Sequence, residues 1–397
     1  MNTKNIFNLL QTRYRFSLRE NRARARARSL ASLEPCPLAL RNGLQEIKNI
    51  FCIQYIILFI VFFSSFNLCF AKPTEIKLSI LAPEGSTWMN IMNEFNKELE
   101  KETKGEVKFK VYAGGVSGDE LDVIRKIRIG QVHAGGFTGV GLGQVVSAVR
   151  VLELPFIFKS YEEVDHVTSN LKSYFEAAFD KKGFVFLGWA EAGFVNVFST
   201  TPITTVEDFK KVKMWAWEGD PLVKALANAY KLVPVSLSIT DVLTSLQTGL
   251  IDSFYAPPLG AIALQWFTKV KYMTQPPMAN ATGAMIMSKK QFNKLSAENQ
   301  KILKEVTAKY STKIIQATRK DNEKSYDVLK KNGIKFVEIS QKDLEDMNKT
   351  SIKVREALVG KLYSKDLLDR TMKLIQEYRT KEEKSPKKPE IKKKPKT

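Results

Sequence analysis

Hydrophobic residues between positions 213 and 258 follow two spacings, and these spacings predict five successive elements. Short continuous apolar runs are typical of buried strands, and apolar residues at every third or fourth position are typical of helices. In order, the elements are a strand at 213–217, a helix at 222–229, a strand at 233–235, a helix at 242–249 and a strand at 251–255. This order indicates a parallel α/β domain, in which ligands bind beyond the carboxyl ends of the strands. We therefore expect Trp217, Glu218 and Tyr255 at a binding cleft.

The same patterns predict α/β structure on both sides of this stretch. Strands are expected at 76–81, 107–111, 183–189, 194–198, 270–273 and 285–287, and helices at 86–99, 121–130 and 161–179. The glycine-rich run 135–143 is expected to be a strand-to-helix turn. It does not match a dinucleotide-binding fingerprint, because Gln144 occupies the third glycine position.

Residues 298–331 have a helical pattern without glycine or proline. One continuous helix of this length would extend about 50 Å, enough to brace two domains. The alternative is a pair of ordinary surface helices broken near Tyr310.

Both ends of the chain differ in composition from the middle. Residues 1–48 contain an Arg-Ala repeat and no apolar period, which fits either a basic arm for nucleic acid or anionic lipid, or an over-long translation start. Residues 49–71 have the apolar run and the small residues Cys69 and Ala71 of a signal peptide cleaved after Ala71. A membrane anchor is the alternative, although the run is shorter than the roughly 20 residues of a spanning helix. Residues 381–397 are basic, lack apolar residues for a core and are expected to be disordered.

The charge distribution and the cysteine content limit the classes of function that the protein can have. The formal net charge is +20, but residues 1–71 contribute +7 and residues 381–397 contribute +5, so the middle of the chain carries only +8. A nucleic-acid binder would concentrate its basic residues on a folded surface, so we expect no nucleic-acid partner. All three cysteines precede residue 72, and the two histidines are not part of any metal-ligand spacing, so neither a metal nor a cofactor is expected.

Four motifs in order resemble the solute-binding proteins of tripartite ATP-independent (TRAP) transporters, in the dicarboxylate-binding, DctP-like family. They are the runs Ala-Pro-Glu-Gly-Ser-Thr-Trp at 82–88, Gly-Gly-Val-Ser-Gly-Asp-Glu at 114–120, Leu-Pro-Phe-Ile-Phe at 154–158 and the signature at 238–252. The resemblance implies a periplasmic-binding-protein-like α/β fold, with two lobes around a cleft joined by crossing strands and a long bracing helix. It places lobe I at 72–196, lobe II at 197–282, a return to lobe I with the lobe-spanning helix at 283–333, and C-terminal helices packing on the lobes at 334–380.

The resemblance fails at the ligand-binding polar residues. Relatives bind an organic-acid carboxylate with an arginine that aligns with Trp215, and a second arginine aligns with Val195. A third polar residue, an asparagine, aligns with Ala256. A tryptophan cannot reproduce the bidentate pairing of arginine with a carboxylate, so we expect a ligand with an apolar or aromatic body. Lys213, Arg150 or a helix N-terminus near Gly139 could still supply a positive field, and an organic acid would then bind.

The expected ligand-binding residues are aromatic and acidic side chains around the cleft. They are Trp88, Phe137, Trp189, Phe194, Trp215, Trp217, Tyr255, Glu84, Glu191 and Glu218. A neutral polar group or an amine of the ligand could meet Glu191 or Glu218.

Three functions fit these features. The first is a periplasmic solute-binding receptor that captures a small organic solute by lobe closure and delivers it to TRAP membrane permease subunits. The second is a secreted enzyme on the same fold that uses Glu218 and Asp220, or Glu191. The third is a protein-binding adaptor or sensor. No nucleophile with a base can be assembled from the motifs, so we expect the receptor, with no catalytic residues and no stable membrane insertion after signal cleavage.

Overall fold

The computed structural model describes residues 73–384. The predicted basic extension, the signal peptide and residues 385–397 lie outside this range. The described residues belong to one compact unit. Among the described residues, no helix is long and apolar enough to cross a membrane.

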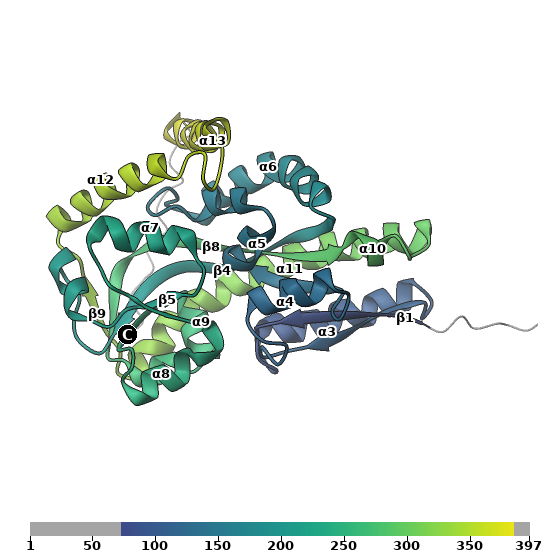
Figure 1. Ribbon diagram of the computed structural model, residues 1–397, viewed down its shortest axis with the longest axis horizontal. Coiled ribbons are helices and arrows are strands. Elements are labelled where there is room, and N and C mark those ends of the chain that lie inside the picture. Colours follow the sequence, from purple (N-terminus) through teal and green to yellow (C-terminus); the bar gives the residue numbers. More distant parts are fainter. Residues whose placement is uncertain (1–72, 385–397) are drawn as a thin grey trace, which may run out of the picture. The chain divides into compact units, whose positions relative to one another are not determined.

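A seven-stranded mixed sheet forms the centre of this unit (Figure 1). Its order is β2–β1–β3–β8–β4–β7, with β9 beside β8. The first three strands, β1 (Thr74–Ile80), β2 (Val107–Tyr112) and β3 (Ala134–Thr138), are parallel to one another. The helices α3 (Thr87–Glu102), α4 (Glu120–Arg128) and α5 (Gly139–Val145) follow them in turn. Ser86 caps α3 by accepting from the Met89 N–H at 3.3 Å. The glycine-rich run 135–143, predicted as a strand-to-helix turn, lies within β3 and α5, which follow each other directly with no turn residue between them.

Two long antiparallel strands cross between the lobes. Sequence patterns predicted four separate short strands here, but the structure has β4 (Phe184–Ser199) and β8 (Tyr272–Ser288), of 16 and 17 residues. Their pairing continues through three register shifts, between Phe186 and Gly188, Glu191 and Gly193, and Val195 and Val197. The polar and glycine residues at these irregular positions interrupt the apolar pattern, which is why the sequence suggested separate strands.

The second lobe differs from the single parallel sheet predicted for 213–258. β5 (Trp215–Trp217) and β6 (Val235–Leu237) form their own parallel pair, whereas β7 (Ser253–Ala256) joins the main sheet antiparallel to β4. One parallel bridge, Met214 to Ser253, connects the two sheets. The predicted helices are α7 (Pro221–Tyr230) and α8 (Val242–Thr248), and α9 (Pro258–Ala263) follows β7.

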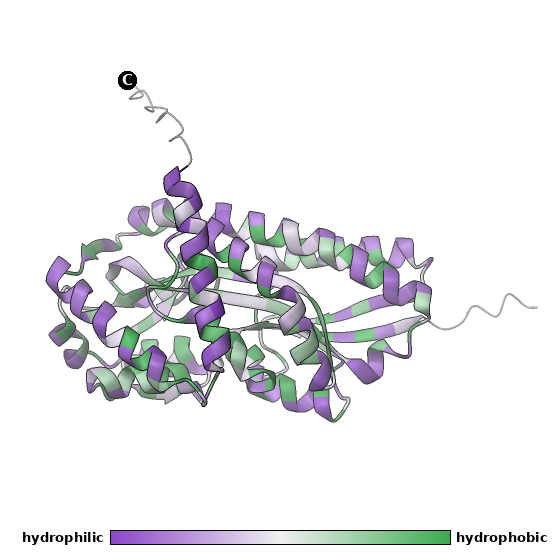
Figure 2. Cartoon of the chain, turned by 90° about the horizontal axis from the view of Figure 1, so that it is seen from above, coloured by the Kyte–Doolittle hydropathy of each residue, from purple (hydrophilic) through white to green (hydrophobic). Residues whose placement is uncertain are grey.

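A single helix, α11 (Ala297–Lys331), runs for 35 residues without a break at Tyr310. It packs against α3, β4 and α9, so it contacts both lobes. The prediction of one continuous helix is therefore confirmed. Figure 2 shows hydrophilic and hydrophobic residues alternating along the long helices, as expected for helices with one buried face.

The C-terminal part adds one strand and two helices to the lobes. They are β9 (Lys335–Glu338), α12 (Gln341–Ala357), which packs on α7, and α13 (Lys365–Lys384), which packs on α6 (Tyr161–Lys181). The Arg379 guanidinium fixes α13 to α6 through the Glu163 carboxylate at 2.7 Å. Because α13 extends to Lys384, the prediction of disorder from residue 381 is wrong for its first four residues. Short helices complete the fold: η1 (Ser147–Glu153), η2 (Val206–Lys211), η3 (Ile239–Asp241), η4 (Trp266–Lys269) and α10 (Lys289–Phe292).

Candidate functional site

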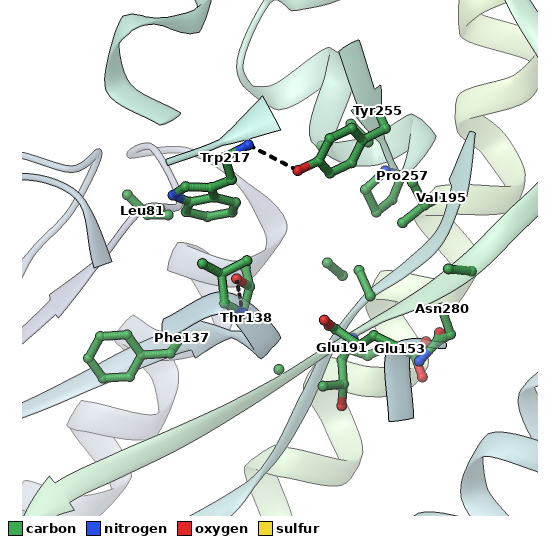
Figure 3. Close-up of a pocket in the computed structure, with 18 of the residues that line it drawn as sticks. Leu81, Phe137, Thr138, Glu153, Glu191, Val195, Trp217, Tyr255, Pro257 and Asn280 are labelled. Atoms are coloured by element: carbon green, nitrogen blue, oxygen red, sulfur yellow. Dashed lines mark hydrogen bonds between the residues drawn. The ribbon is translucent and has the colours of Figure 1, made fainter. Parts of the chain in front are cut away.

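A cavity of about 420 Å³ lies where the crossing strands meet both lobes. Figure 3 shows Trp217 and Tyr255 on one side of it and Phe137 and Thr138 on the other. Its size is within the range of pockets that enclose a small organic molecule. Most of its wall is aliphatic or aromatic.

Seven of the ten predicted site residues line this cavity: Trp88, Phe137, Trp189, Glu191, Trp215, Trp217 and Tyr255. The structure places the other three outside the wall. Glu218 is exposed in the turn after β5, and Glu84 is exposed in the turn before α3. Phe194 packs against the Tyr161 ring instead, with 4.8 Å between centroids. These three residues therefore do not line this cavity, and their contact with the ligand stays a prediction.

The carboxylate pair of the enzyme hypothesis does not form either. Glu218 is exposed, whereas the Asp220 carboxylate is buried and bound to Arg150 at 2.7 Å. Asp220 also accepts from the Leu222 N–H at 2.9 Å and so caps α7. Among the residues at 73–384, no group of three or more His, Cys, Asp or Glu side chains could hold a metal ion.

Stacked aromatic rings form the lobe II side of the cavity. The Trp215 ring stacks on Tyr255 at 4.9 Å, and its Nε1 donates to the Leu237 carbonyl at 3.0 Å. The Tyr255 hydroxyl accepts from the Trp217 N–H at 3.2 Å, the bond drawn in Figure 3. Burial raises the pKa of Tyr255, so the phenol remains neutral at any physiological pH. The Trp215 Nε1 and the Tyr255 hydroxyl are thus engaged by neighbouring protein groups.

The positions at which relatives carry polar ligand-binding residues all line the cavity. Trp215, Val195 and Ala256 are each part of its wall. Among the described residues, the wall contains the carboxylates of Glu120, Glu153 and Glu191 but no lysine, arginine or histidine. The lost arginines are therefore not replaced by another cation in the wall.

Each of the three alternative sources of positive field is already engaged by protein groups within the described residues. Lys213 is exposed, and its Nζ donates to the Gly249 carbonyl at 3.0 Å. Arg150 is 4% exposed and is bound by two carboxylates behind the wall. At the N-terminus of α5, the Gly141 N–H already donates to Glu120 at 2.8 Å.

Arg150 is the centre of a buried charge cluster that joins the lobes. Its guanidinium binds Glu153 on η1 and Asp220 at the start of α7. The Glu153 carboxylate also accepts from the Thr282 N–H at 2.8 Å. Burial alone would lower the pKa of Arg150, but the two carboxylates outweigh it and raise that pKa, so the arginine remains charged. Two carboxylates thus compensate one cation, and no positive charge remains for an anionic ligand.

Glu191 is likewise already paired. Its carboxylate accepts from Arg319 on α11 through two bonds, of 3.0 and 2.8 Å, and Arg319 also binds Asp165 at 2.7 Å. Glu191 is therefore not available to an amine of the ligand, contrary to the sequence-based expectation. Arg319 was not predicted as part of the site, because it lies in a lysine-rich helix whose charged residues have the pattern of a solvent-exposed face.

Glu120 is a buried carboxyl group in the cavity wall. It accepts from the Thr138 N–H at 2.7 Å, the Thr138 hydroxyl at 2.9 Å and the Gly141 N–H. Burial raises its pKa from 4.5 to about 7, and these three donors oppose the rise. The carboxyl group is therefore partly protonated near neutral pH.

This pKa predicts a pH dependence of stability. Between pH 4.5 and 7 the folded protein holds a proton on Glu120 that the unfolded chain has released, so the free energy of unfolding falls as pH rises through this window. The expected contribution is roughly 3 kcal/mol. Urea unfolding at pH 4.5 to 8 should show a steeper decline for the natural protein than for Glu120→Gln. Equal slopes would contradict the assignment.

A second polar cluster connects the lobes at Asp119. This carboxylate, which is 7% exposed, accepts from three groups of lobe II: Trp217 Nε1 at 3.0 Å, the Ser238 hydroxyl at 2.8 Å and the Ile239 N–H at 3.0 Å. It also caps α4 within lobe I by accepting from the Leu121 N–H at 3.3 Å. Since the three bonds span the cleft, they can exist only while the lobes are in contact.

Two cavity-lining residues carry buried polar atoms without a hydrogen-bond partner within 73–384. They are Trp189, through Nε1, and Asn280, through both Nδ2 and Oδ1. The sequence analysis missed Asn280, which lies in a strand segment without a regular apolar pattern. A lone asparagine there gives no sequence signal of its own.

Two α/β lobes, two crossing strands, a helix that contacts both lobes and a cavity between them define a two-lobed solute-binding protein. The family model for bacterial extracellular solute-binding proteins, family 7, matches residues 78–361. The chain therefore belongs to this family, that of the TRAP solute receptors. The family consists of binding proteins, which supports a receptor and not the secreted enzyme.

Individual relatives agree with this assignment. The C4-dicarboxylate-binding periplasmic protein DctP of Rhodobacter capsulatus is 27% identical over 270 residues, which cover 66% of this chain and 79% of that protein. The sugar acid binding protein DctPAm of Advenella mimigardefordensis, solved with galactonate, has a TM-score of 0.73 and 19% identity over 77% of this chain and 99% of its own. A TRAP solute-binding protein of Haemophilus influenzae, solved with L-gulonate, has a TM-score of 0.71 and 24% identity over 76% and 99%. These similar structures support the two-lobed fold.

Proposed function

We propose that this protein is the periplasmic receptor of a TRAP transporter for an uncharged, largely apolar solute. The single observation that carries the proposal is the cavity wall, which has aromatic and aliphatic surface, three carboxylates and no cationic side chain among the described residues. The structurally similar receptors above were solved with sugar acids. The lost arginine positions suggest that this chain has diverged from them in its ligand.

Electrostatics favours a neutral ligand. A carboxylate moved from water into this cavity would lose its hydration without gaining a cationic partner, and such a transfer is strongly unfavourable. Glu120, Glu153 and Glu191 would add repulsion when ionised. An apolar body in contact with the aliphatic and aromatic wall of the cavity would instead gain free energy by leaving water.

Delivery to a membrane permease is the other part of the proposal. Family 7 membership and the family's extracellular location support it, and so does the predicted signal peptide. Contacts of Asp119 and Arg150 across the cleft fit a receptor that closes around its solute.

The experiment is to identify the solute that the protein carries. The chain should be purified from its native host without refolding, denatured, and the released small molecules identified by mass spectrometry. We expect a neutral molecule with an apolar or aromatic body in near-stoichiometric amount. A released sugar acid or dicarboxylate that rebinds to the refolded protein would refute the proposal.

A further inference from the structure

Asn280 is a buried carboxamide in an apolar cavity. It lies on β8 opposite Phe194 of β4 and is 1% exposed. Neither its Nδ2 nor its Oδ1 has a hydrogen-bond partner among the described residues. Native proteins pair nearly all buried polar side-chain atoms, because an unpaired one loses its hydration without compensation.

The carboxylates of the wall, unlike Asn280 and Trp189 Nε1, are paired within the protein. Glu120 accepts three hydrogen bonds, Glu153 binds Arg150 and the Thr282 N–H, and Glu191 binds Arg319. The nearest chemical match to Asn280 is Asn196 on β4, which is also buried. Its Nδ2 donates to the Thr274 carbonyl at 2.9 Å, and its Oδ1 accepts from the Tyr326 hydroxyl. One buried asparagine of the crossing strands is thus satisfied within the protein and the other is not.

We propose that Asn280 is the polar recognition point of the cavity and that it pairs with a neutral ligand group carrying both a hydrogen-bond donor and an acceptor. A primary amide, a lactam or a urea has this pattern and would bond Nδ2 and Oδ1 together. A carboxylate could accept from Nδ2 but would set its second oxygen against Oδ1. Figure 3 shows Asn280 in the same part of the cavity as Glu153 and Glu191, which also disfavour an anion. This assignment rests on the proposed function and specifies the ligand class.

The test compares ligand binding and stability in Asn280→Leu, which keeps the side-chain size and removes both polar atoms. The probes are phenylacetamide and hexanamide, each with its N,N-dimethyl derivative, which accepts but cannot donate. By calorimetry, we expect the natural protein to bind each primary amide at least about ten-fold more tightly than the dimethyl derivative. In Asn280→Leu this preference should disappear.

Two control variants separate recognition from a structural role. Asn196→Leu removes a satisfied asparagine and should lower the melting temperature of the probe-free protein. Thr318→Val removes a buried hydroxyl that also lacks a partner but does not line the cavity, so it should leave probe affinity unchanged. Asn280→Leu should melt no lower than the natural protein, because its carboxamide has no protein partner to lose.

Each contrary result has a separate meaning. A melting temperature of Asn280→Leu as low as that of Asn196→Leu would show a structural role and overturn the assignment. Binding of the primary amides that is equal in Asn280→Leu and the natural protein would also overturn it, as would no binding of any amide probe. Tight binding of phenylacetate or hexanoate instead of the amides would refute the proposed function itself.

Discussion

Replacing Arg150 by methionine is expected to destabilise the protein by about 3–5 kcal/mol. The substitution leaves the buried carboxylates of Glu153 and Asp220 without their cation. Removal of one partner from a buried charge cluster is far more costly than the net contribution of the cluster, since the remaining charges are neither hydrated nor paired. In a chain of this size the melting temperature should fall by roughly 5–10 °C, which calorimetry would measure.

A triple variant provides the control for this prediction. Arg150→Met combined with Glu153→Gln and Asp220→Asn contains no buried charge at this place. The glutamine can still accept from the Thr282 N–H, and asparagine is as good an N-cap for α7 as aspartate. Most of the lost stability should therefore return. If Arg150→Met alone melts within 2 °C of the natural protein, the cluster does not have the energetic role assigned to it.

The second large effect concerns Asp119, whose replacement by alanine should weaken solute retention by at least ten-fold. The variant loses the three hydrogen bonds from Trp217, Ser238 and Ile239 that cross the cleft. Bonds to a charged group each contribute about 1.5–3 kcal/mol, and a factor of ten corresponds to 1.4 kcal/mol. Since these bonds form only when the lobes are in contact, their loss shifts the equilibrium toward the open form. The amount of co-purified solute that remains after extended dialysis would measure the effect.

Asp119 also caps α4, and a variant at Asp122 distinguishes this capping role from the contact across the cleft. The Asp122 carboxylate accepts from the Asp119 N–H at 3.2 Å in the capping box, but it makes no bond across the cleft. Asp122→Ala should therefore lower stability slightly and leave solute retention unchanged. If Asp122→Ala loses solute as readily as Asp119→Ala, helix capping and not the cross-cleft contact explains the effect.

Local patterns predicted most of the fold. The N-cap at Ser86 and the uninterrupted α11 both follow from signals within one element. The patterns failed where an element depends on partners distant in sequence. The lengths of β4 and β8 depend on pairing with each other through register shifts, and β7 leaves the expected parallel sheet because it pairs with β4.

The candidate site was only partly predictable for the same reason. The sequence pattern predicted three tryptophans that line the cavity, Trp88, Trp215 and Trp217. Large aromatic rings at the ends of predicted strands and helices indicate a ligand cleft without further information. Arg319 and Asn280 were not predicted as parts of the site, and Arg150 was named only as a possible source of positive field. The roles of the two arginines depend on side chains more than 60 positions away, and Asn280 has no side-chain hydrogen-bond partner among the described residues. Glu218, also expected at the site, is exposed in the turn after β5 and does not line the cavity.

The central claim, that the cavity accepts a neutral solute and rejects an anion, is tested most directly with ligands that differ only in charge. Isothermal titration should compare phenylacetamide with phenylacetate and hexanamide with hexanoate, and should include succinate and galactonate. The lack of a cation in the described cavity wall predicts that each amide binds at least ten-fold more tightly than its carboxylate, and that succinate and galactonate do not bind measurably. Micromolar or tighter binding of succinate or galactonate, with the amides weaker than their acids, would contradict the claim.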